Sequence, residues 1–405
     1  MPHVLYATAR LPAGEGEPFV VAEVLALERQ GWEVTVVPVR GSGKVVHGDA
    51  RRLNAWAFPL VNVRIAAGAL AEALRRPRAA AAAVRSLRSS KGRSVHLRNL
   101  AVVPKALWLS RRARSVGAGH IHAHWASTPS TMAMLAARMA DIPWSLTAHR
   151  WDIAENNLLR EKAESACFVR VISAHGADEL RRLVGLDDFE PAVLYMGVDL
   201  PPPASPAPHR SPLRIVTPAK LVEKKGHEHL LQAVRVLHER GVVVRVDFAG
   251  DGPLGPALRQ QAADLGLQDA VVFLGTLSHD ELLRRMGAAE WDAVVLPSVI
   301  TESGELEGIP VSLMEALALG VPAVGTDAGG TPELLGGGAG ILVPPADPDA
   351  LGQALERLIS DAELRADLGR TGRARVEERF DVDRIASELA ARFRGCGGPQ
   401  AFSSA

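Results

Sequence analysis

Short hydrophobic runs rich in Val, Ile and Leu recur along the chain, and longer segments with helical spacing separate them. In the first half the runs cover 4–7, 34–39, 120–123, 145–148 and 168–172, with helical stretches such as 19–29 and 131–140 between them. In the second half they cover 214–217, 242–249, 270–274, 293–296, 322–325 and 340–343. Strands that are apolar throughout and alternate with helices are typical of parallel sheets buried on both faces. The pattern predicts an α/β protein with two doubly wound, Rossmann-like domains.

A proline-rich segment, 201–212, separates the two halves of this pattern. Because such proline density excludes helix interiors and central strands, we predict a stiff linker there, between an N-terminal domain at 1–200 and a C-terminal domain at 213–375. We expect 376–395 to form a C-terminal helix that packs back towards the N-terminal domain. Open α/β sheets bind ligands outside the carboxyl ends of their strands, so a cleft between the domains is the expected active site.

The charge and cysteine content narrow the class of protein. The 405 residues contain 46 Lys and Arg against 46 Asp and Glu, so no net charge indicates nucleic acid as a partner. The halves differ, however: residues 1–200 hold 26 basic and 18 acidic side chains (+8), and residues 201–405 hold 20 and 28 (−8). Cys167 and Cys396 are far apart and form no CxxC pair, so we expect neither a disulfide scaffold nor a cysteine zinc site. With no signal-peptide pattern and no spanning apolar segment, we expect a cytoplasmic protein.

Two glutamates flank the start of a predicted helix in the second half. Glu307 precedes a helix that holds Pro310 in its first turn and ends near Gly320, and Glu315 lies about one and a half turns inside it. The free amides of a first helical turn bind anions. Either glutamate alone would more often be structural, for example as a carboxylate favoured by the helix dipole. Their spacing around an anion site instead suits a nucleotide sugar, which carries hydroxyl-bearing rings on both sides of its phosphates.

Two lysines flank a turn at the end of the first strand of the second half. Lys220 and Lys225 precede a predicted helix, so both ammonium groups can converge on one diphosphate. The alternative is a solvated pair formed by Lys224 and Lys225. A glycine turn at Gly250 and Gly252 follows the next strand and lets the backbone approach a ligand, although such a turn is weak evidence by itself.

The chain resembles the retaining glycosyltransferases of family 4, which have the GT-B fold of two Rossmann-like domains facing across a cleft. The resemblance extends over 5–380 and rests on motifs in a fixed order: Lys220 and Lys225-Gly226, 249–253, 273–278, 296–298, the element from Glu307 to Glu315, and 328–334. The first half is similar to a bacterial polysaccharide or natural-product subgroup through 16–23, 120–127 and 145–153.

The resemblance implies a role for individual residues. Glu315 would hold the ribose hydroxyls of the donor, and Glu307 would hold the hydroxyls of the donor sugar. Lys220 and Lys225 would hold the diphosphate. His149 would lie across the cleft near the donor sugar. We therefore expect His149, Glu307, Lys225 and Lys220 to be catalytic. The other donor-binding residues would be Gly14, Gly16, Gly250, Gly275, Leu277, Gly308, Ile309, Pro310 and Val311, and the acceptor-binding residues would be Glu17, Phe19 and His124.

The expected reaction is transfer of a hexose-type sugar, with retention, from a nucleoside diphosphate sugar to a saccharide acceptor or a lipid-linked precursor. UDP is the favoured nucleotide, the pathway would make a polysaccharide or a secondary metabolite, and no metal or cofactor is implied. Two alternatives stay open: a nucleotide-sugar epimerase of the same architecture and a non-catalytic sugar-nucleotide sensor. An epimerase would need no acceptor, whereas a sensor would be expected to have lost Glu307 or the lysines.

His120, His122 and His124 alternate along a predicted strand and so share one face, a pattern that suggests a metal site. We favour a structural role beside the cleft, because no carboxylate companion lies nearby.

Residues 71–114 contain 12 Lys or Arg and a single acid, Glu72. Such a basic amphipathic region can lie on an anionic membrane. A solvated helix surface is the equally weighted alternative.

Overall fold

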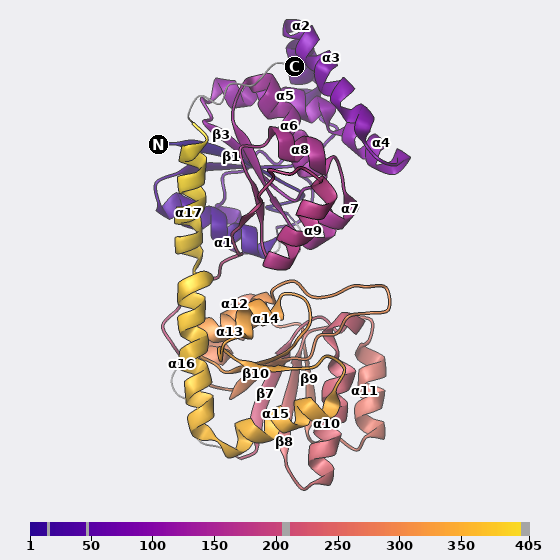
Figure 1. Ribbon diagram of the computed structural model, residues 1–405, viewed down its shortest axis with the longest axis vertical. Coiled ribbons are helices and arrows are strands. Elements are labelled where there is room, and N and C mark those ends of the chain that lie inside the picture. The colour runs from indigo at the N-terminus through magenta and orange to yellow at the C-terminus, as the bar shows by residue number, and fades with distance from the viewer. Residues whose placement is uncertain (14–16, 46–47, 205–210, 398–405) are drawn as a thin grey trace. The chain divides into compact units, whose positions relative to one another are not determined.

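The computed structural model describes residues 1–13, 17–45, 48–204 and 211–397, and its elements are labelled in Figure 1. The predicted donor-binding residues Gly14 and Gly16 lie outside this part of the chain. The chain divides into two compact units. The first contains Met1–Gly197 together with the segment that begins at Val382, and the second is Val198–Asp381.

The first unit is built on a parallel six-stranded sheet in the order β2-β1-β3-β4-β5-β6. Its strands are β1 (His3–Thr8), β2 (Glu33–Pro38), β3 (His120–His124), β4 (Trp144–Ala148), β5 (Val169–Val171) and β6 (Ala192–Val193). β1, β3 and β4 are buried along their whole length, as their apolar sequences predict. β6 has only two residues and is not fully buried, and the hydrophobic pattern did not predict it.

Helices cover the first sheet and form a projection at one end of this unit (Figure 1). They are α1 (Pro18–Arg29), η1 (Asp49–Arg52), α2 (Val63–Arg75), α3 (Pro77–Arg85), η2 (Ser86–Ser89), α4 (Arg93–Ala101), α5 (Val103–Ser115), α6 (Thr128–Ala140), α7 (Arg150–Glu155), α8 (Leu159–Ser165), α9 (Ala174–Val184) and α17 (Val382–Gly395). α17 packs against α1, and Arg29 Nη2 lies 2.8 Å from Asp383 Oδ1 between them. Buried side chains of α17, including Ile385 and Leu389, share a core with β1 and α1.

The second unit has a parallel six-stranded sheet in the order β12-β11-β10-β7-β8-β9. Its strands are β7 (Leu213–Pro218), β8 (Val244–Ala249), β9 (Val271–Gly275), β10 (Ala293–Leu296), β11 (Ala323–Thr326) and β12 (Ile341–Val343). Its helices are η3 (Glu223–Lys225), α10 (His227–Glu239), α11 (Gly255–Asp264), α12 (His279–Gly287), α13 (Val311–Ala318), α14 (Thr331–Leu335), α15 (Pro348–Ser360) and α16 (Ala362–Arg379). Two doubly wound α/β sheets confirm the predicted fold class.

The structure refines two expectations about the chain's connections. Part of the proline-rich segment belongs to the second unit, where Ala204 N donates to Leu319 O at 2.8 Å and Arg373 Nη1 donates to Pro201 O at 2.7 Å. Residues 205–210 of that segment lie outside the described residues. The expected helix at 376–395 is two helices, because α16 ends at Arg379 in the second unit and α17 begins three residues later in the first.

The two cysteines are joined in a disulfide, which the sequence spacing did not predict. Cys167 precedes β5 and Cys396 follows α17, and their Cα atoms are 5.9 Å apart. A sequence separation of 229 residues hides the pairing, because it arises only when α17 returns to the first unit. Among the described residues, no helix is both long and apolar enough to cross a bilayer.

Candidate active site

The strand order of the second unit reverses between β7 and β10. β7 leads into the turn that holds Lys220 and Lys225, and β10 leads into the loop that holds Glu307. Open α/β sheets bind ligands at this kind of switch point, outside the carboxyl ends of the strands. The fold therefore brings together the predicted lysines and the predicted glutamate at the position where a ligand is expected.

Lys225 and Glu307 meet directly at this point. Lys225 Nζ forms an ion pair with Glu307 Oε2, and the two side chains are only 16% and 15% exposed. In such a half-buried setting the attraction between opposite charges is stronger than in bulk water. The ion pair holds a cation and a carboxylate side by side at the switch point.

Two glycines allow the neighbouring turns to pack against the loop after β10. Gly226 has a φ of +64°, and a Cβ there would lie 1.9 Å from the carbonyl oxygen of Pro297. Gly329, with a φ of +63°, would place a Cβ 1.9 Å from the carbonyl oxygen of Glu307. Only glycine tolerates both this backbone conformation and this contact. The lysine turn thus packs against the start of this loop at Pro297, and the turn after β11 packs against Glu307 itself.

Helix α13 begins next to Glu307 and presents its N-terminus to the same edge of the sheet. Pro310 is its N-cap, and the Pro310 carbonyl accepts from Leu313 N and Met314 N at 3.2 and 3.1 Å. The first amides of a helix have no acceptor inside the helix and bind anions. Gly308, Ile309 and Val311 are half-buried here, as expected for backbone that lines a site.

Glu315 lies one and a half turns into α13 and is 11% exposed. Its Oε1 atom is 2.7 Å from Nε2 of His279, the first residue of α12. The hydrogen bond to Glu315 raises the pKa of His279 above its usual value, against the opposing effect of partial burial. The carboxylate that we predict to hold a ribose is therefore already oriented by an imidazole.

The turns after β8 and β9 lie beside the lysine turn. A Cβ on Gly250 would be 1.9 Å from the carbonyl oxygen of Ala219, and Gly250 forms a bridge with Gly275. Leu277 is half-buried in the segment that follows. The structure thus gathers Lys220, Gly250 and Gly275 at one edge of the second sheet.

Several buried polar atoms at these strand ends have no hydrogen-bond partner among the described residues. They are Thr217 Oγ1 at the end of β7, Ser298 Oγ after β10 and both ring nitrogens of His227 at the start of α10. Burial and the nearby Lys225 charge lower the pKa of His227 to about 4, so its ring is neutral at pH 7. Buried polar groups are almost always paired, and exceptions gather at functional sites. These atoms are a second indication of a site at the switch point.

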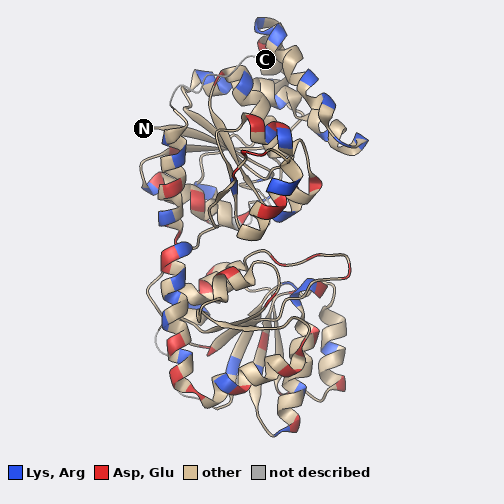
Figure 2. Cartoon of the chain, in the orientation of Figure 1, with Lys and Arg blue, Asp and Glu red and all other residues tan. Residues whose placement is uncertain are grey.

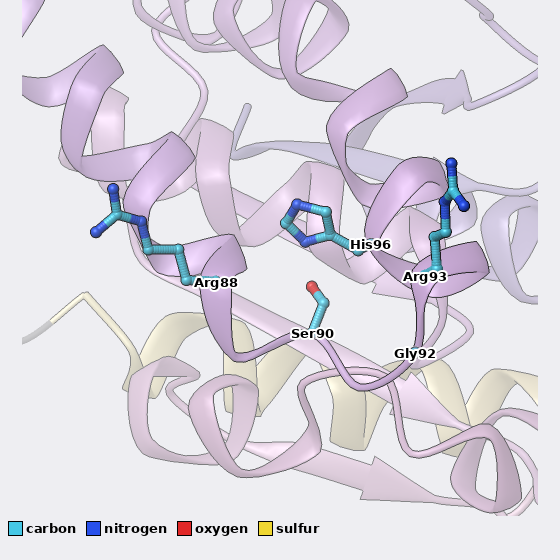
Figure 3. A pocket seen from close by; sticks show the side chains of 5 residues that line it. All are labelled: Arg88, Ser90, Gly92, Arg93 and His96. Carbon is cyan, nitrogen blue, oxygen red and sulfur yellow. The ribbon is translucent and has the colours of Figure 1, made fainter.

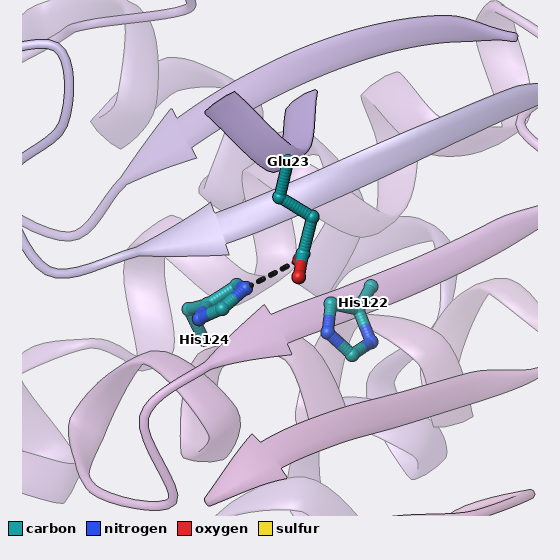
Figure 4. A group of neighbouring side chains, drawn as sticks. All are labelled: Glu23, His122 and His124. Atoms are coloured by element: carbon teal, nitrogen blue, oxygen red, sulfur yellow. Dashed lines mark hydrogen bonds and ion pairs between the residues drawn. The ribbon is translucent and has the colours of Figure 1, made fainter. Parts of the chain in front are cut away.

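The predicted residues of the first unit surround a buried chain of polar contacts. Glu23, on α1, accepts from Nε2 of His124 at 2.8 Å (Figure 4). Glu23 also pairs with Arg170, and all three side chains are buried. Burial alone would raise the pKa of Glu23, but the Arg170 and His124 charges outweigh it and hold that pKa well below its usual range. His124 Nδ1 is 3.3 Å from Nε2 of His149, so the chain leads from the interior to the end of β4.

His149 is packed between aromatic rings and is 5% exposed. The ring centroids of Trp125 and Phe19 are 4.2 and 5.5 Å from its own. The Asp152 carboxylate fixes its backbone by accepting from His149 N at 2.7 Å and from Ala126 N. Asp152 therefore joins the turns after β3 and β4, and burial raises its pKa to about 7 against the opposing effect of these amides.

Glu17 and His124 have other partners than the acceptor that we expected them to bind. The Glu17 carboxylate accepts from the amides of Ala9, Arg10 and Leu11 at 2.8–3.2 Å and from the indole of Trp125 at 2.7 Å. Four donors saturate this carboxylate, so it fixes the turn after β1. His124 has no exposed surface and supports His149. Of the three predicted acceptor-binding residues, Glu17 and His124 are buried and Phe19 is half-buried.

The expectation that no carboxylate lies near the strand histidines is wrong. Helix α1 packs on the first sheet and brings Glu23 next to His124, 101 residues away in sequence, with His122 close by (Figure 4). Arg170, fully buried against the same carboxylate, supplies the positive charge there. His122 bonds to Ser145 and Thr147 at 2.8 and 2.9 Å, and the structural role of the strand histidines stays a prediction.

Sequence reasoning assigned no role to Glu23, Arg170 or His279. The partners of Glu23 are 101 and 147 residues away, and a single sequence contains no signal for such contacts. Two hints were available, because Glu23 ends the 16–23 motif and His279 directly follows the 273–278 motif.

Comparison with solved structures places the architecture in a known class. The chain matches Anabaena Alr3699/HepE, solved in complex with UDP, with a TM-score of 0.70 and 18% identity over 98% of this chain and 100% of that one. Together with the two parallel six-stranded sheets, this match identifies the GT-B fold of glycosyltransferases.

The second unit matches a known family model over most of its length. Residues 204–375 match the family model "Glycosyl transferases group 1", so this part of the chain is a group 1 glycosyl transferase domain. The chain is also 39% identical over 204 residues to the putative colanic acid biosynthesis glycosyltransferase WcaL of Escherichia coli, covering 49% of this chain and 50% of that protein. It is 37% identical over 180 residues to the amylovoran biosynthesis glycosyltransferase AmsK of Erwinia amylovora, covering 44% of each. The chain thus spans about half the length of the curated relatives that it matches.

Proposed function

We propose that the protein is a retaining glycosyltransferase that transfers a hexose-type sugar from a nucleoside diphosphate sugar to a saccharide acceptor in polysaccharide biosynthesis. The observation that carries this proposal is the Lys225–Glu307 ion pair at the β7/β10 switch point, beside the N-terminus of α13. The match to the group 1 glycosyl transferase model supports it, as do the relatives' names, which refer to colanic acid biosynthesis and amylovoran biosynthesis.

The donor's diphosphate would bind where positive charge and free amides meet. Lys225, Lys220 and the first amides of α13 offer charge-assisted hydrogen bonds to phosphate oxygens. Glu307 can then accept from hydroxyls of the donor sugar, and Glu315 can accept from the ribose. UDP is the favoured nucleotide, and the presence of UDP in the HepE structure supports this choice.

The chemistry follows from stabilising the leaving group. The bond between the anomeric carbon and the diphosphate oxygen breaks, and the acceptor oxygen bonds to the same face of the sugar. The acceptor's proton passes to the departing diphosphate oxygen. Lys225 and the α13 amides stabilise the negative charge that develops on that oxygen, so the proposed reaction needs neither a metal nor a cofactor.

Lys225→Ala tests this proposal. A panel of nucleotide sugars and saccharide acceptors is screened for release of nucleoside diphosphate, and the best pair is used to compare variants. We expect turnover to fall about 10²–10³-fold, because removal of one preorganised charged donor has an effect of this size. Lys224→Ala, which changes the adjacent lysine, should stay within a few-fold of wild type.

Wild-type turnover by Lys225→Ala would contradict the assignment of the diphosphate site. Conversion of the donor to a second nucleotide sugar without any acceptor would show an epimerase instead. Tight binding of the donor without turnover on any acceptor would show a sensor.

A further inference from the structure

Helix α2 has two apolar faces, and only one of them is packed. Ile65 and Ala69 are buried on the face that meets α5. A second apolar stripe runs along α2 at positions i, i+7 and i+11, which are Val63, Leu70 and Leu74. These side chains are 80%, 62% and 74% exposed. Contiguous exposed apolar surface is typical of an interaction site.

Exposed apolar side chains are concentrated around this helix. Among the described residues, 13 large hydrophobic side chains are exposed, and six of them lie within 61–97: Val61, Val63, Leu70, Leu74, Val84 and Leu97. They come from α2, α3, α4 and the residues just before α2, which form the helical projection of the first unit in Figure 1. We call these helices and their exposed side chains the α2–α4 face.

The same face is strongly basic. Between Asp49 and Asp141 the sequence contains a single acid, Glu72, which is buried and pairs with Arg114. Nine lysines and arginines between 61 and 98 are exposed, and Figure 2 shows these basic residues distributed over α2–α4. Within the described ranges, no carboxylate lies within ion-pair distance of seven of them, namely Arg64, Arg75, Arg78, Arg85, Arg88, Lys91 and Arg93.

A hollow on this face has the chemistry of a phosphate site. It has a volume of about 450 Å³ and is lined by Arg88, Ser90, Gly92, Arg93 and His96, between η2 and α4. Figure 3 shows His96 and Ser90 between the two arginine side chains. His96 Nδ1 is 3.1 Å from the Leu87 carbonyl oxygen, and this contact holds the ring in place. Two guanidinium groups around such a hollow suit an anionic headgroup.

We propose that the α2–α4 face docks the protein on an anionic phospholipid bilayer. Helices that lie in a membrane interface combine a protruding apolar stripe with flanking Lys and Arg, as α2 does here. The apolar side chains would enter the boundary between headgroups and acyl chains, while the arginines would bind phosphate groups. Charge complementarity selects anionic lipids over neutral ones. This proposal rests on the first unit alone and is independent of the proposed reaction.

Co-sedimentation of the full-length protein with vesicles tests the proposal. Vesicles of phosphatidylcholine with 30% phosphatidylglycerol are compared with pure phosphatidylcholine at low and high salt. We expect binding to the anionic vesicles at low salt only, because the attraction is screened as salt rises. Each basic side chain near an anionic surface strengthens partitioning about five-fold, so Arg75→Gln/Arg78→Gln/Arg85→Gln should weaken it by about 100-fold.

Two further variants separate the apolar and basic contributions. Leu70→Gln/Leu74→Gln should also weaken binding by at least about ten-fold, through lost insertion of apolar surface. The control Arg182→Gln/Arg259→Gln/Arg384→Gln removes the same charge from exposed positions elsewhere and should bind like wild type. Thermal unfolding of every variant establishes that it is folded.

Absence of binding to anionic vesicles at low salt would overturn the proposal. Equal binding to both kinds of vesicle, or equal losses in the two triple variants, would overturn it as well. Retention on an acidic protein or polysaccharide column without vesicle binding would assign the face to a different partner.

Discussion

A chain of polar contacts connects the interior of the first unit to the end of β4. It consists of Arg170, Glu23, His124 and His149. The arrangement depends on Glu23, which accepts from Tyr6 Oη at 2.7 Å and from His124 at 2.8 Å and also pairs with Arg170. A carboxylate with three buried partners fixes the position of each of them. Glu23 is therefore a positioning residue for His149, acting through His124.

Glu23→Gln should lower the free energy of unfolding by about 3–5 kcal/mol at pH 7, because it leaves the Arg170 charge buried without a counter-ion. The pKa of Glu23 is lower in the folded than in the unfolded protein, so its contribution is present above about pH 4.5 and is lost as the pH falls through the folded value. Urea unfolding at pH 7 and below pH 4.5 measures this contribution. The difference in the free energy of unfolding between wild type and variant should be smaller in acid. Glu33→Gln, at an exposed position, is the control. A difference in the free energy of unfolding that is unchanged or larger in acid would contradict this account.

Glycine turns determine how the elements around the β7/β10 switch point fit together. Gly226 needs both its positive φ and the absence of a Cβ, because the Pro297 carbonyl oxygen occupies that space. Gly241, after α10, has a φ of +74° but no atom within 4 Å of the Cβ position. The two positions therefore separate backbone strain from steric contact.

Gly241→Ala should cost about 1–2 kcal/mol of stability, which is the cost of the left-handed conformation alone. Gly226→Ala should cost at least about 1–3 kcal/mol more, because the lysine turn must move away from β10. It should also weaken binding of nucleoside diphosphate, which calorimetry measures, whereas Gly241→Ala should not. Equal losses of stability and unchanged binding in the two variants would show that the contact at Pro297 is unimportant.

The elements that could be predicted from sequence are those whose signal is local. The run at 293–296 coincides with β10, and most other predicted strands differ by one or two residues at an end, because a strand buried on both faces is apolar throughout. The two-residue β6 has no such signal.

At the site, Glu307 and Lys225 stand in recognisable motifs, whereas Glu23 and Arg170 meet only through packing of α1 and β5. Their pairing depends on the tertiary fold, which local patterns do not specify.

On the scale of the whole molecule, the chain leaves the first unit after Gly197 and returns to it at Val382. The Cys167–Cys396 disulfide cross-links the chain on both sides of this segment. The loop that the disulfide closes contains the entire second unit. Cross-links that close long loops restrict the unfolded chain most in the loop-entropy description.

Cys396→Ser should therefore lower the stability of the first unit by about 4–5 kcal/mol in oxidised protein. Denaturant unfolding with and without a thiol reductant measures this. Reduced wild type should match the variant, and the variant should be insensitive to the reductant. Identical unfolding of oxidised and reduced wild type would contradict the prediction.

The return of α17 to the first unit also sets an order of events during protein synthesis. The core around β1 and α1 contains four residues of α17 that the ribosome makes only after the whole second unit: Val382, Ile385, Leu389 and Phe393. The second unit ends at Asp381 and has all of its strands before that point. Domains usually fold in the order in which they are synthesised. Here the first unit cannot complete its core before α17 is made, so part of its apolar surface stays uncovered. The second unit can complete its fold first. The apolar surface that α17 covers therefore stays exposed to misfolding contacts until α17 has emerged.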